Sequence, residues 1–130
     1  MIDARALLAV GGGAALGGIL RLLVTQVVVA RFGAGFGHYA TLFINVSGSF
    51  LIGIVAEVAQ TRIGFPPLWR SFLATGLLGG YTTFSTFSYE AFVLAADGLY
   101  ASAAFYVAGS VVLGIAAAIG GIALVRSAGH

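Results

Sequence analysis

The chain has 130 residues, of which 60% are apolar and 8% are charged, and its formal net charge of +2 includes six arginines and no lysine. Soluble globular domains carry roughly a quarter of their residues as charged side chains, so this composition excludes an ordinary soluble protein and predicts a membrane protein. The arginines form no basic stripe, which argues against nucleic-acid binding, and the absence of cysteine excludes disulfides and cysteine metal sites.

Four apolar stretches are each long enough to cross the roughly 30 Å hydrocarbon core of a bilayer. They cover residues 6–30, 39–60, 68–95 and 99–125. The loops between them are short and rich in turn residues, so consecutive helices are expected to lie antiparallel. The sequence therefore predicts an all-α membrane protein with a single transmembrane domain over residues 1–130, surrounded by membrane lipid.

The arginines also carry an orientation signal. Arg5, Arg62, Arg70 and Arg126 would lie at one side of the membrane, whereas Arg31 lies at the other. The positive-inside rule then favours termini inside, but the bias is modest and leaves insertion in both orientations open.

Small residues recur at helical spacing in the first two spans. Gly13 and Gly17 are four residues apart, as are Ser49 and Gly53. In lipid, this spacing is typical of helices whose backbones approach closely. We interpret both pairs first as helix-packing motifs.

Three strongly polar residues lie inside the first two spans, where such side chains are costly and are therefore functional candidates. Glu57 is near a span end, and its simplest explanation is that it reaches to the membrane surface. Arg21 could do the same or could have a functional role. Asn45 has Gly48 and Ser49 on adjoining helix faces, which favours a place in a pore or vestibule.

The third span is interrupted by glycines and then carries many hydroxyl groups. Gly76, Gly79 and Gly80 precede Thr82 and Thr83. This pattern predicts a broken third helix, whose unwound backbone is tolerated only where protein or water covers it. A break of this kind offers carbonyl oxygens to a cation and amide groups to an anion.

Aromatic and hydroxyl side chains follow the predicted break. Phe84 and Phe87 share one helical face, while Thr83, Thr86 and Glu90 line a neighbouring face. The edges of aromatic rings carry partial positive charge and can meet a small anion. The third span therefore predicts an ion site.

The remaining polar residues form no recognisable catalytic set. Tyr106 and Ser110 place two hydroxyls on one face of the fourth span, for which hydrogen bonding between helices is an adequate explanation. His38 and His130 are far apart and are expected to be solvated. Because no nucleophile with its base, phosphate loop or metal cluster can be assembled, we predict that the protein is not an enzyme.

The third span also resembles a family signature. Residues 79–88, GGYTTFSTFS, together with Glu90 resemble the GGxTTFSTFS…E motif of the CrcB/Fluc family of fluoride channels. Residues 17–21, GGILR, resemble the arginine motif of that family's first span, and residues 42–48, LFINVSG, resemble the asparagine motif of its second. The length and the number and order of spans agree as well.

The resemblance implies a dual-topology dimer, in which two copies lie antiparallel in the membrane with two fluoride pathways along their interface. One complete set of motifs favours a homodimer over a pair of paralogues. The implied function is passive, electrogenic export of cytoplasmic fluoride, which reduces its toxicity, by a multi-pass protein of the prokaryotic plasma membrane. The resemblance also implies a structural Na⁺ at the dimer interface, held by the backbone carbonyls of Gly79 and Thr82.

By the same resemblance, Arg21 would give the aqueous vestibule a positive potential that attracts anions. Gly114, one turn after Ser110, departs from the pattern, because some members of the family have a further serine there. The fluoride pathway implied by the resemblance comprises Asn45, Phe84, Ser85, Thr86, Phe87, Glu90, Tyr106 and Ser110.

Three other functions stay open at this point. A small dual-topology proton-coupled exporter would have similar length and span number, but such proteins carry an acid in the first span, where this chain has Arg21. Glu57 and Glu90 are acids in other spans, so that alternative stays open. A proton-coupled fluoride antiporter and a structural subunit without transport are the other two.

Overall fold

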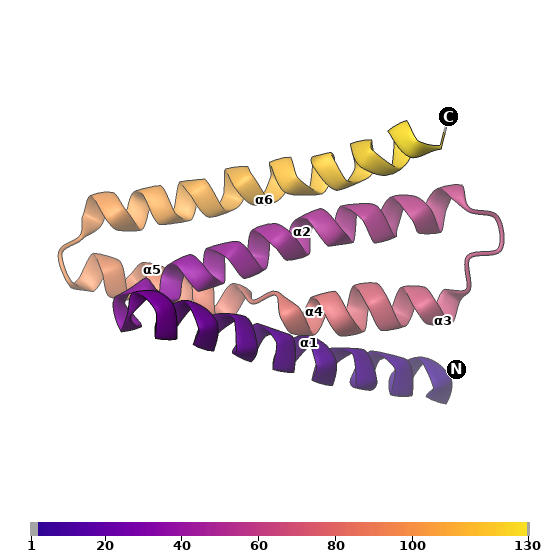
Figure 1. Cartoon of the computed structure of the whole chain (residues 1–130), viewed down its shortest axis with the longest axis horizontal. Coiled ribbons are helices and arrows are strands. Elements are labelled where there is room, and N and C mark those ends of the chain that lie inside the picture. Colours follow the sequence, from indigo (N-terminus) through magenta and orange to yellow (C-terminus); the bar gives the residue numbers. More distant parts are fainter. Residues whose placement is uncertain (1–2, 130) are drawn as a thin grey trace.

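The computed structural model describes residues 3–129, which form helices joined by short connections and contain no strand (Figure 1). The all-α prediction is therefore confirmed. The start of α1, the end of α6 and the loop after α2 lie at one end of the molecule, and the α5–α6 connection lies at the other (Figure 1). The elements are α1 (Ala4–Phe32), the 3₁₀ turn η1 (Ala34–Phe36), α2 (Gly37–Thr61), α3 (Pro67–Arg70), the π-helical η2 (Ser71–Leu78), α4 (Gly79–Tyr81), α5 (Phe84–Ala96) and α6 (Tyr100–Ala128).

Within residues 3–129, three stretches are long and apolar enough to cross a membrane, namely α1, Ala34–Thr61 and α6. The fourth apolar stretch lies beside them but is not one continuous helix (Figure 1). It passes from α3 through the π-helical η2 into the short α4, and at Thr82 and Thr83 the backbone becomes extended before α5 begins. The predicted break is thus present at the predicted threonines.

Glycines set how closely the helices pack. A side chain at Gly17 of α1 would overlap the backbone oxygen of Leu77, and one at Gly53 of α2 would overlap that of Ala118 in α6. The packing role predicted for these two glycines is confirmed, because α1 lies against the third segment and α2 lies against α6 only where a side chain is missing.

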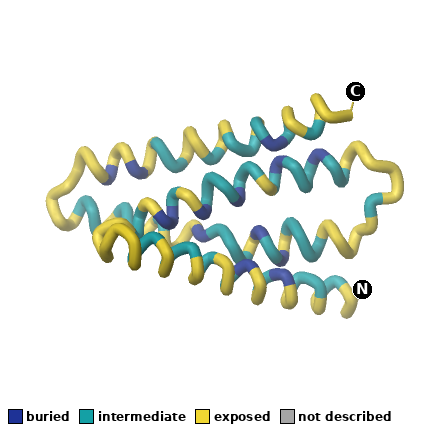
Figure 2. Tube along the Cα trace, in the orientation of Figure 1, coloured by how far each residue is buried: buried dark blue, intermediate teal, exposed yellow. Residues whose placement is uncertain are grey.

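Little of the apolar surface is covered within one chain. The tube in Figure 2 is mostly exposed or intermediate, including nearly all of the outward faces of α1 and α6. A soluble domain would bury such side chains, and lipid or a partner chain has to cover them here. The buried apolar residues are Ala40, Ile44, Leu78, Ala103 and Tyr106.

Candidate functional site

Two consecutive threonines make the break between α4 and α5. Thr82 still closes a helical turn, because its backbone N–H and its hydroxyl both donate to the Leu78 carbonyl, at 3.0 and 2.9 Å. Thr83 is extended and caps α5, since its Oγ1 accepts from the Thr86 backbone N–H at 3.3 Å. Threonine suits this place because a β-branched residue tolerates extended backbone and its hydroxyl replaces a lost backbone partner.

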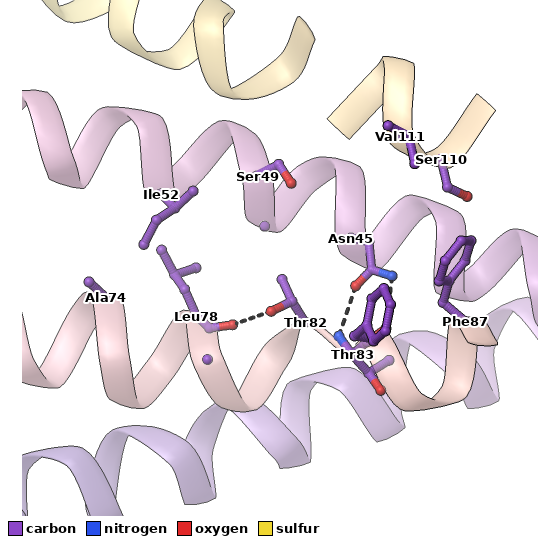
Figure 3. Close-up of a pocket in the computed structure, with 13 residues that line it drawn as sticks. Asn45, Ser49, Ile52, Ala74, Leu78, Thr82, Thr83, Phe87, Ser110 and Val111 are labelled. Carbon is purple, nitrogen blue, oxygen red and sulfur yellow. Dashed lines mark hydrogen bonds between the residues drawn. The ribbon is translucent and has the colours of Figure 1, made fainter. Parts of the chain in front are cut away.

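The side chain of Asn45 in α2 holds the break in place. Its Nδ2 donates to the Thr83 carbonyl at 3.0 Å, and its Oδ1 accepts from the Thr83 N–H at 2.8 Å (Figure 3). The amide thus satisfies both backbone groups of Thr83, much as a neighbouring strand would. Nδ2 carries a second N–H, so Asn45 can also offer a donor to the pocket that it lines.

Arg21 reaches the same break from α1. It is half-buried, and its Nη1 donates to the Thr82 carbonyl at 3.4 Å. The choice left open by the sequence is therefore decided: the guanidinium points to the break rather than to the membrane surface. On the other side of Thr82, a side chain at Gly48 would overlap the Thr82 methyl group, so glycine is needed there.

A pocket of about 460 Å³ lies between the break, α2, α5 and α6 (Figure 3). None of the residues that line it is charged. The Ser110 hydroxyl is buried and has no hydrogen-bond partner among residues 3–129. A pocket with neutral donors and no carboxylate suits a small anion better than a cation. Its polar lining comes from Asn45, Ser49, Thr82, Thr83 and Ser110, and its aromatic lining from Phe84 and Phe87.

Three aromatic rings continue from the pocket towards α6. The ring centroids of Phe84 and Phe87 are 5.7 Å apart, and those of Phe87 and Tyr106 are 5.3 Å apart. Phe84 is 79% exposed, so one of its faces is open to whatever covers this side of the chain. The tilted packing leaves ring edges, which carry partial positive charge, available at the pocket.

Beyond these rings, the carboxylate of Glu90 in α5 is held by two hydroxyls. Tyr106 donates to Oε2 at 2.7 Å, and Thr41 donates to Oε1 at 3.0 Å. Thr41 is buried, and a methyl group added at Gly37, the first residue of α2, would lie 3.9 Å from Oε1. The positive end of the α2 dipole therefore helps to stabilise this carboxylate.

Sequence reasoning missed Thr41. The signal was present, because Thr41 lies one helical turn before Asn45 and therefore on the same face of α2. A single threonine in an apolar helix is common, however. Thr41 donates a hydrogen bond to Glu90 only because α5 packs beside it.

The chain matches a known protein family. Residues 8–122 match the family model described as CrcB-like protein, Camphor Resistance (CrcB). The chain belongs to the CrcB family. The resemblance noted in its first three spans is therefore confirmed by a match over most of its length.

Several relatives are similar along most of their length. One from Rhizobium meliloti (strain 1021) is 47% identical over 121 residues, which cover 93% of this chain and 96% of that protein. Another from Methylobacterium sp. (strain 4-46) is 51% identical over 117 residues, covering 90% and 93%. A third from Nitrobacter winogradskyi is 49% identical over 127 residues, covering 92% and 94%. Each of these relatives is named a fluoride-specific ion channel, FluC.

The CrcB chain does not bring every predicted pathway residue to the pocket. Ser85 and Thr86 are exposed on the first turn of α5 and do not line it. Their hydroxyls lie 3.4 and 3.0 Å from the Thr83 Oγ1. Within one chain these two hydroxyls therefore support the cap of α5 and face outward.

Ser49 of α2 supplies a hydroxyl near the position where the fourth span lacks one. A side chain added at Gly114 would lie 3.6 Å from the Ser49 Oγ, and Ser49 lines the pocket. The packing role first given to Ser49 is thus incomplete. A hydroxyl from α2 thus lies beside Gly114, where α6 has none.

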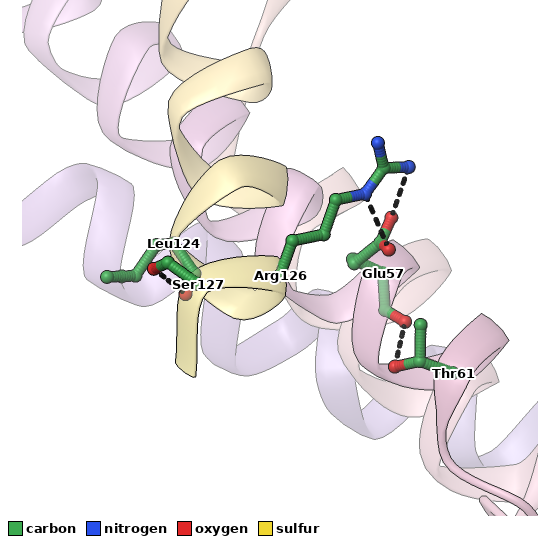
Figure 4. Close-up of polar contacts among 5 residues, drawn as sticks. All are labelled: Glu57, Thr61, Leu124, Arg126 and Ser127. Carbon is green, nitrogen blue, oxygen red and sulfur yellow. Dashed lines mark hydrogen bonds and ion pairs between the residues drawn. The ribbon is translucent and has the colours of Figure 1, made fainter. Parts of the chain in front are cut away.

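Glu57 lies away from the pocket, and the expectation that it reaches the membrane surface is wrong. It is buried, and its two oxygens accept from the Arg126 Nε at 2.9 Å and Nη2 at 3.2 Å (Figure 4). Two parallel hydrogen bonds of this kind are the strongest arrangement of an ion pair. Arg126 comes from α6, so the pair joins the C-terminal ends of α2 and α6.

Proposed function

We propose that this CrcB protein is a subunit of a fluoride-selective channel, through which cytoplasmic fluoride leaves passively down its electrochemical gradient. The observation that carries the proposal is the buried Ser110 hydroxyl, which lacks a partner among the described residues and borders a pocket without charged side chains. An unpaired buried hydroxyl is costly, and an anion in the pocket would satisfy it. The names of the FluC relatives support the same ion.

The donors around the pocket match the chemistry of fluoride. Fluoride is small, strongly hydrated and a strong acceptor, so a pore has to replace its water with several donors at short range. Asn45 has a spare N–H, Ser49 and Ser110 have hydroxyls, and Phe84 and Phe87 present ring edges. Chloride is larger and accepts hydrogen bonds more weakly, so the same lining favours fluoride.

We further propose that residues 67–96 form a fourth, broken span and that two identical copies pair in opposite orientations in the plasma membrane. The support is the composition of the open face: Phe84 is 79% exposed, and the hydroxyls of Ser85 and Thr86 lie beside extended backbone. Lipid would cover the Phe84 ring but offers no hydrogen-bond partner to exposed hydroxyls, whereas a second copy would cover both. The pathway would then run between the two copies.

A structural Na⁺ at that interface is also part of the proposal. In a continuous helix the Thr83 N–H would bond the Gly79 carbonyl, but here it donates to Asn45, so the end of α4 offers free carbonyl oxygen at a negative helix terminus. Gly79 therefore fits a hard cation. Thr82 fits less well, because Arg21 already donates to its carbonyl and would repel a cation there. Bound Na⁺ would neutralise these carbonyls and tie the two breaks together.

The proposed cation has a direct test in the stability of the dimer. Thermal unfolding in detergent should occur at a higher temperature in NaCl than in choline chloride of equal ionic strength, because a ligand of the folded state raises its stability. Equal unfolding temperatures in the two salts would refute the cation and leave the fluoride pathway untouched.

The exporter alternative needs an acid that can exchange protons at the transport site. Glu57 is paired with Arg126, and Glu90 is held by Thr41 and Tyr106, so neither lines the pocket. A proton-coupled exporter is therefore disfavoured. Glu90 could still carry a proton in a fluoride antiporter, which accumulation driven by a pH gradient would reveal.

Efflux from liposomes tests the proposed function. Vesicles containing purified protein are loaded with KF or KCl, valinomycin is added, and ion-selective electrodes follow release. We expect rapid fluoride release only after valinomycin and no chloride release, because a selective channel carries net charge. Release of neither ion from a folded dimer would refute the channel and favour a structural subunit.

A further inference from the structure

His38 was expected to be solvated, and the structure shows it partly exposed. It is the second residue of α2 and is half-buried. Its ring stands edge-on to Tyr106 of α6, with centroids 5.6 Å apart at 79°, and it packs against Tyr39 at 4.2 Å. A polar ring held between two tyrosines has a defined position rather than the freedom of a solvated side chain.

His38 continues the row of side chains that starts at the pocket. The rings of Phe84, Phe87, Tyr106 and His38 contact one another in that order. α2 begins one residue before His38, so the row stops at the start of α2, at the opposite end of the molecule from the start of α1 and the end of α6 (Figure 1). In a membrane this end lies at the water interface.

An acidic side chain from α5, Glu90, lies beside this turn of α2 and opposes an anion pathway. Both oxygens of Glu90 accept from hydroxyls, and a methyl group added at Gly37, the residue before His38, would lie 3.9 Å from Oε1. Among the described residues, the titratable side chains in hydrogen-bond or ring contact with His38 or Glu90 are Tyr106 from α6 and Tyr39 from α2 itself, and Arg31, in the last turn of α1, makes no such contact with either. Neither tyrosine supplies positive charge, so His38 is the contacting group that can offset Glu90.

We propose that His38 is the outermost residue of the fluoride pathway and that fluoride passes more readily when its imidazole is protonated. Histidine changes charge between about pH 5 and 8. The neutral ring has one N–H donor, whereas the protonated ring has two and a positive charge. The inference rests on the proposed fluoride channel and concerns its pH dependence.

Single-channel or macroscopic current in planar bilayers tests this inference, with equal fluoride on both sides at pH 8 and at pH 6. Hydrogen fluoride is neutral and carries no current, so its leakage through lipid does not interfere. We expect the current at pH 6 to exceed that at pH 8 by about threefold, the effect of one charge within a Debye length of an aqueous mouth.

Two substitutions should remove the pH dependence in opposite ways. His38→Asn should give the low current of pH 8 at both pH values, and His38→Arg should give the high current at both, since its charge is fixed. The control is His130→Asn, which changes the chain's other histidine and should keep the wild-type profile. Thermal unfolding in detergent verifies that each variant is folded.

The outcomes separate this inference from the channel itself. A wild-type pH profile in His38→Asn would overturn the role of His38 and point to Glu90 as the titrating group. A fluoride current that is the same at pH 6 and pH 8 in the wild type would also overturn it. Absence of fluoride current at every pH would overturn the proposed function and this inference together.

Discussion

At the scale of single residues, the side chains at the break each have two tasks. Asn45 satisfies both backbone groups of Thr83 and still has one N–H for the pocket. The side chain of Thr83 caps α5, while its backbone is held by Asn45. Because one substitution disturbs both the architecture and the lining, flux and stability should be measured together at these positions.

Asn45→Asp should reduce fluoride efflux at least about tenfold and destabilise the protein by roughly 1–3 kcal/mol. The aspartate oxygen can still accept from the Thr83 N–H, but the Thr83 carbonyl then faces a second acceptor, and the pocket gains a negative charge. Liposome efflux and denaturant unfolding in detergent measure the two effects. Gln60→Glu adds the same charge to an exposed residue of α2 and should change neither. Wild-type efflux from Asn45→Asp would contradict the pathway.

At the scale of helices, two kinds of contact hold the elements together. Glycines let α1 approach the third segment and α2 approach α6, and an ion pair joins the ends of α2 and α6. In lipid the hydrophobic effect does not drive helices together, so close packing and polar contacts have a larger share in specifying the arrangement than they have in a soluble bundle.

Gly17 and Gly18 are neighbours with opposite environments. A side chain at Gly17 would overlap the Leu77 oxygen, whereas nothing lies within 4 Å of the corresponding position at Gly18. Gly17→Ala should therefore destabilise the protein by about 2 kcal/mol through overpacking. Gly18→Ala should be neutral or stabilising by up to about 1 kcal/mol, because alanine favours helix. Unfolding in detergent measures both, and equal effects would contradict the packing described for α1.

The ion pair predicts an asymmetry between its two partners. Arg126→Gln leaves the buried Glu57 carboxylate without its partner and should lower the unfolding temperature more than Glu57→Gln, which leaves only an exposed arginine. The exposed Arg5 provides the control, since Arg5→Gln removes the same charge from the same end of the molecule. A larger loss from Glu57→Gln than from Arg126→Gln would contradict this asymmetry, and losses no larger than that of Arg5→Gln would show that the contact is unimportant for stability.

At the scale of the whole molecule, the pocket and the end of α4 open on one side of the chain. Gly79 is exposed there, and a side chain added to it would meet nothing closer than the Ala74 oxygen at 3.8 Å. One chain by itself therefore gives no reason for glycine at this position. A second copy that packs against the break would give one.

Gly79→Leu should leave the subunit folded but abolish the proposed dimer and, with it, fluoride efflux. Light scattering during size-exclusion chromatography gives the number of copies, and circular dichroism verifies the helices. Gly11→Leu is the matched control, because Gly11 is an exposed helical glycine of α1 with open space around it. A dimeric, active Gly79→Leu protein would refute an interface at the break.

The sequence alone determined the features that depend on composition and local propensity. Low charge and long apolar stretches predicted a helical membrane protein, and glycines followed by Thr82 and Thr83 predicted the broken segment, because these properties need no knowledge of neighbours. The sequence motifs also predicted membership of the CrcB family, and the match to the family model confirmed it.

Only the tertiary structure decided which polar groups meet. Arg126 lies 69 residues from Glu57, and Thr41 lies 49 residues from Glu90, yet each pair is in contact. The helices are apolar around most of their circumference, so their sequences do not say which face turns inward, as an amphipathic helix would. Helix rotation and packing set these contacts, and they also decided that Glu57 is buried and that His38 lies against Tyr106.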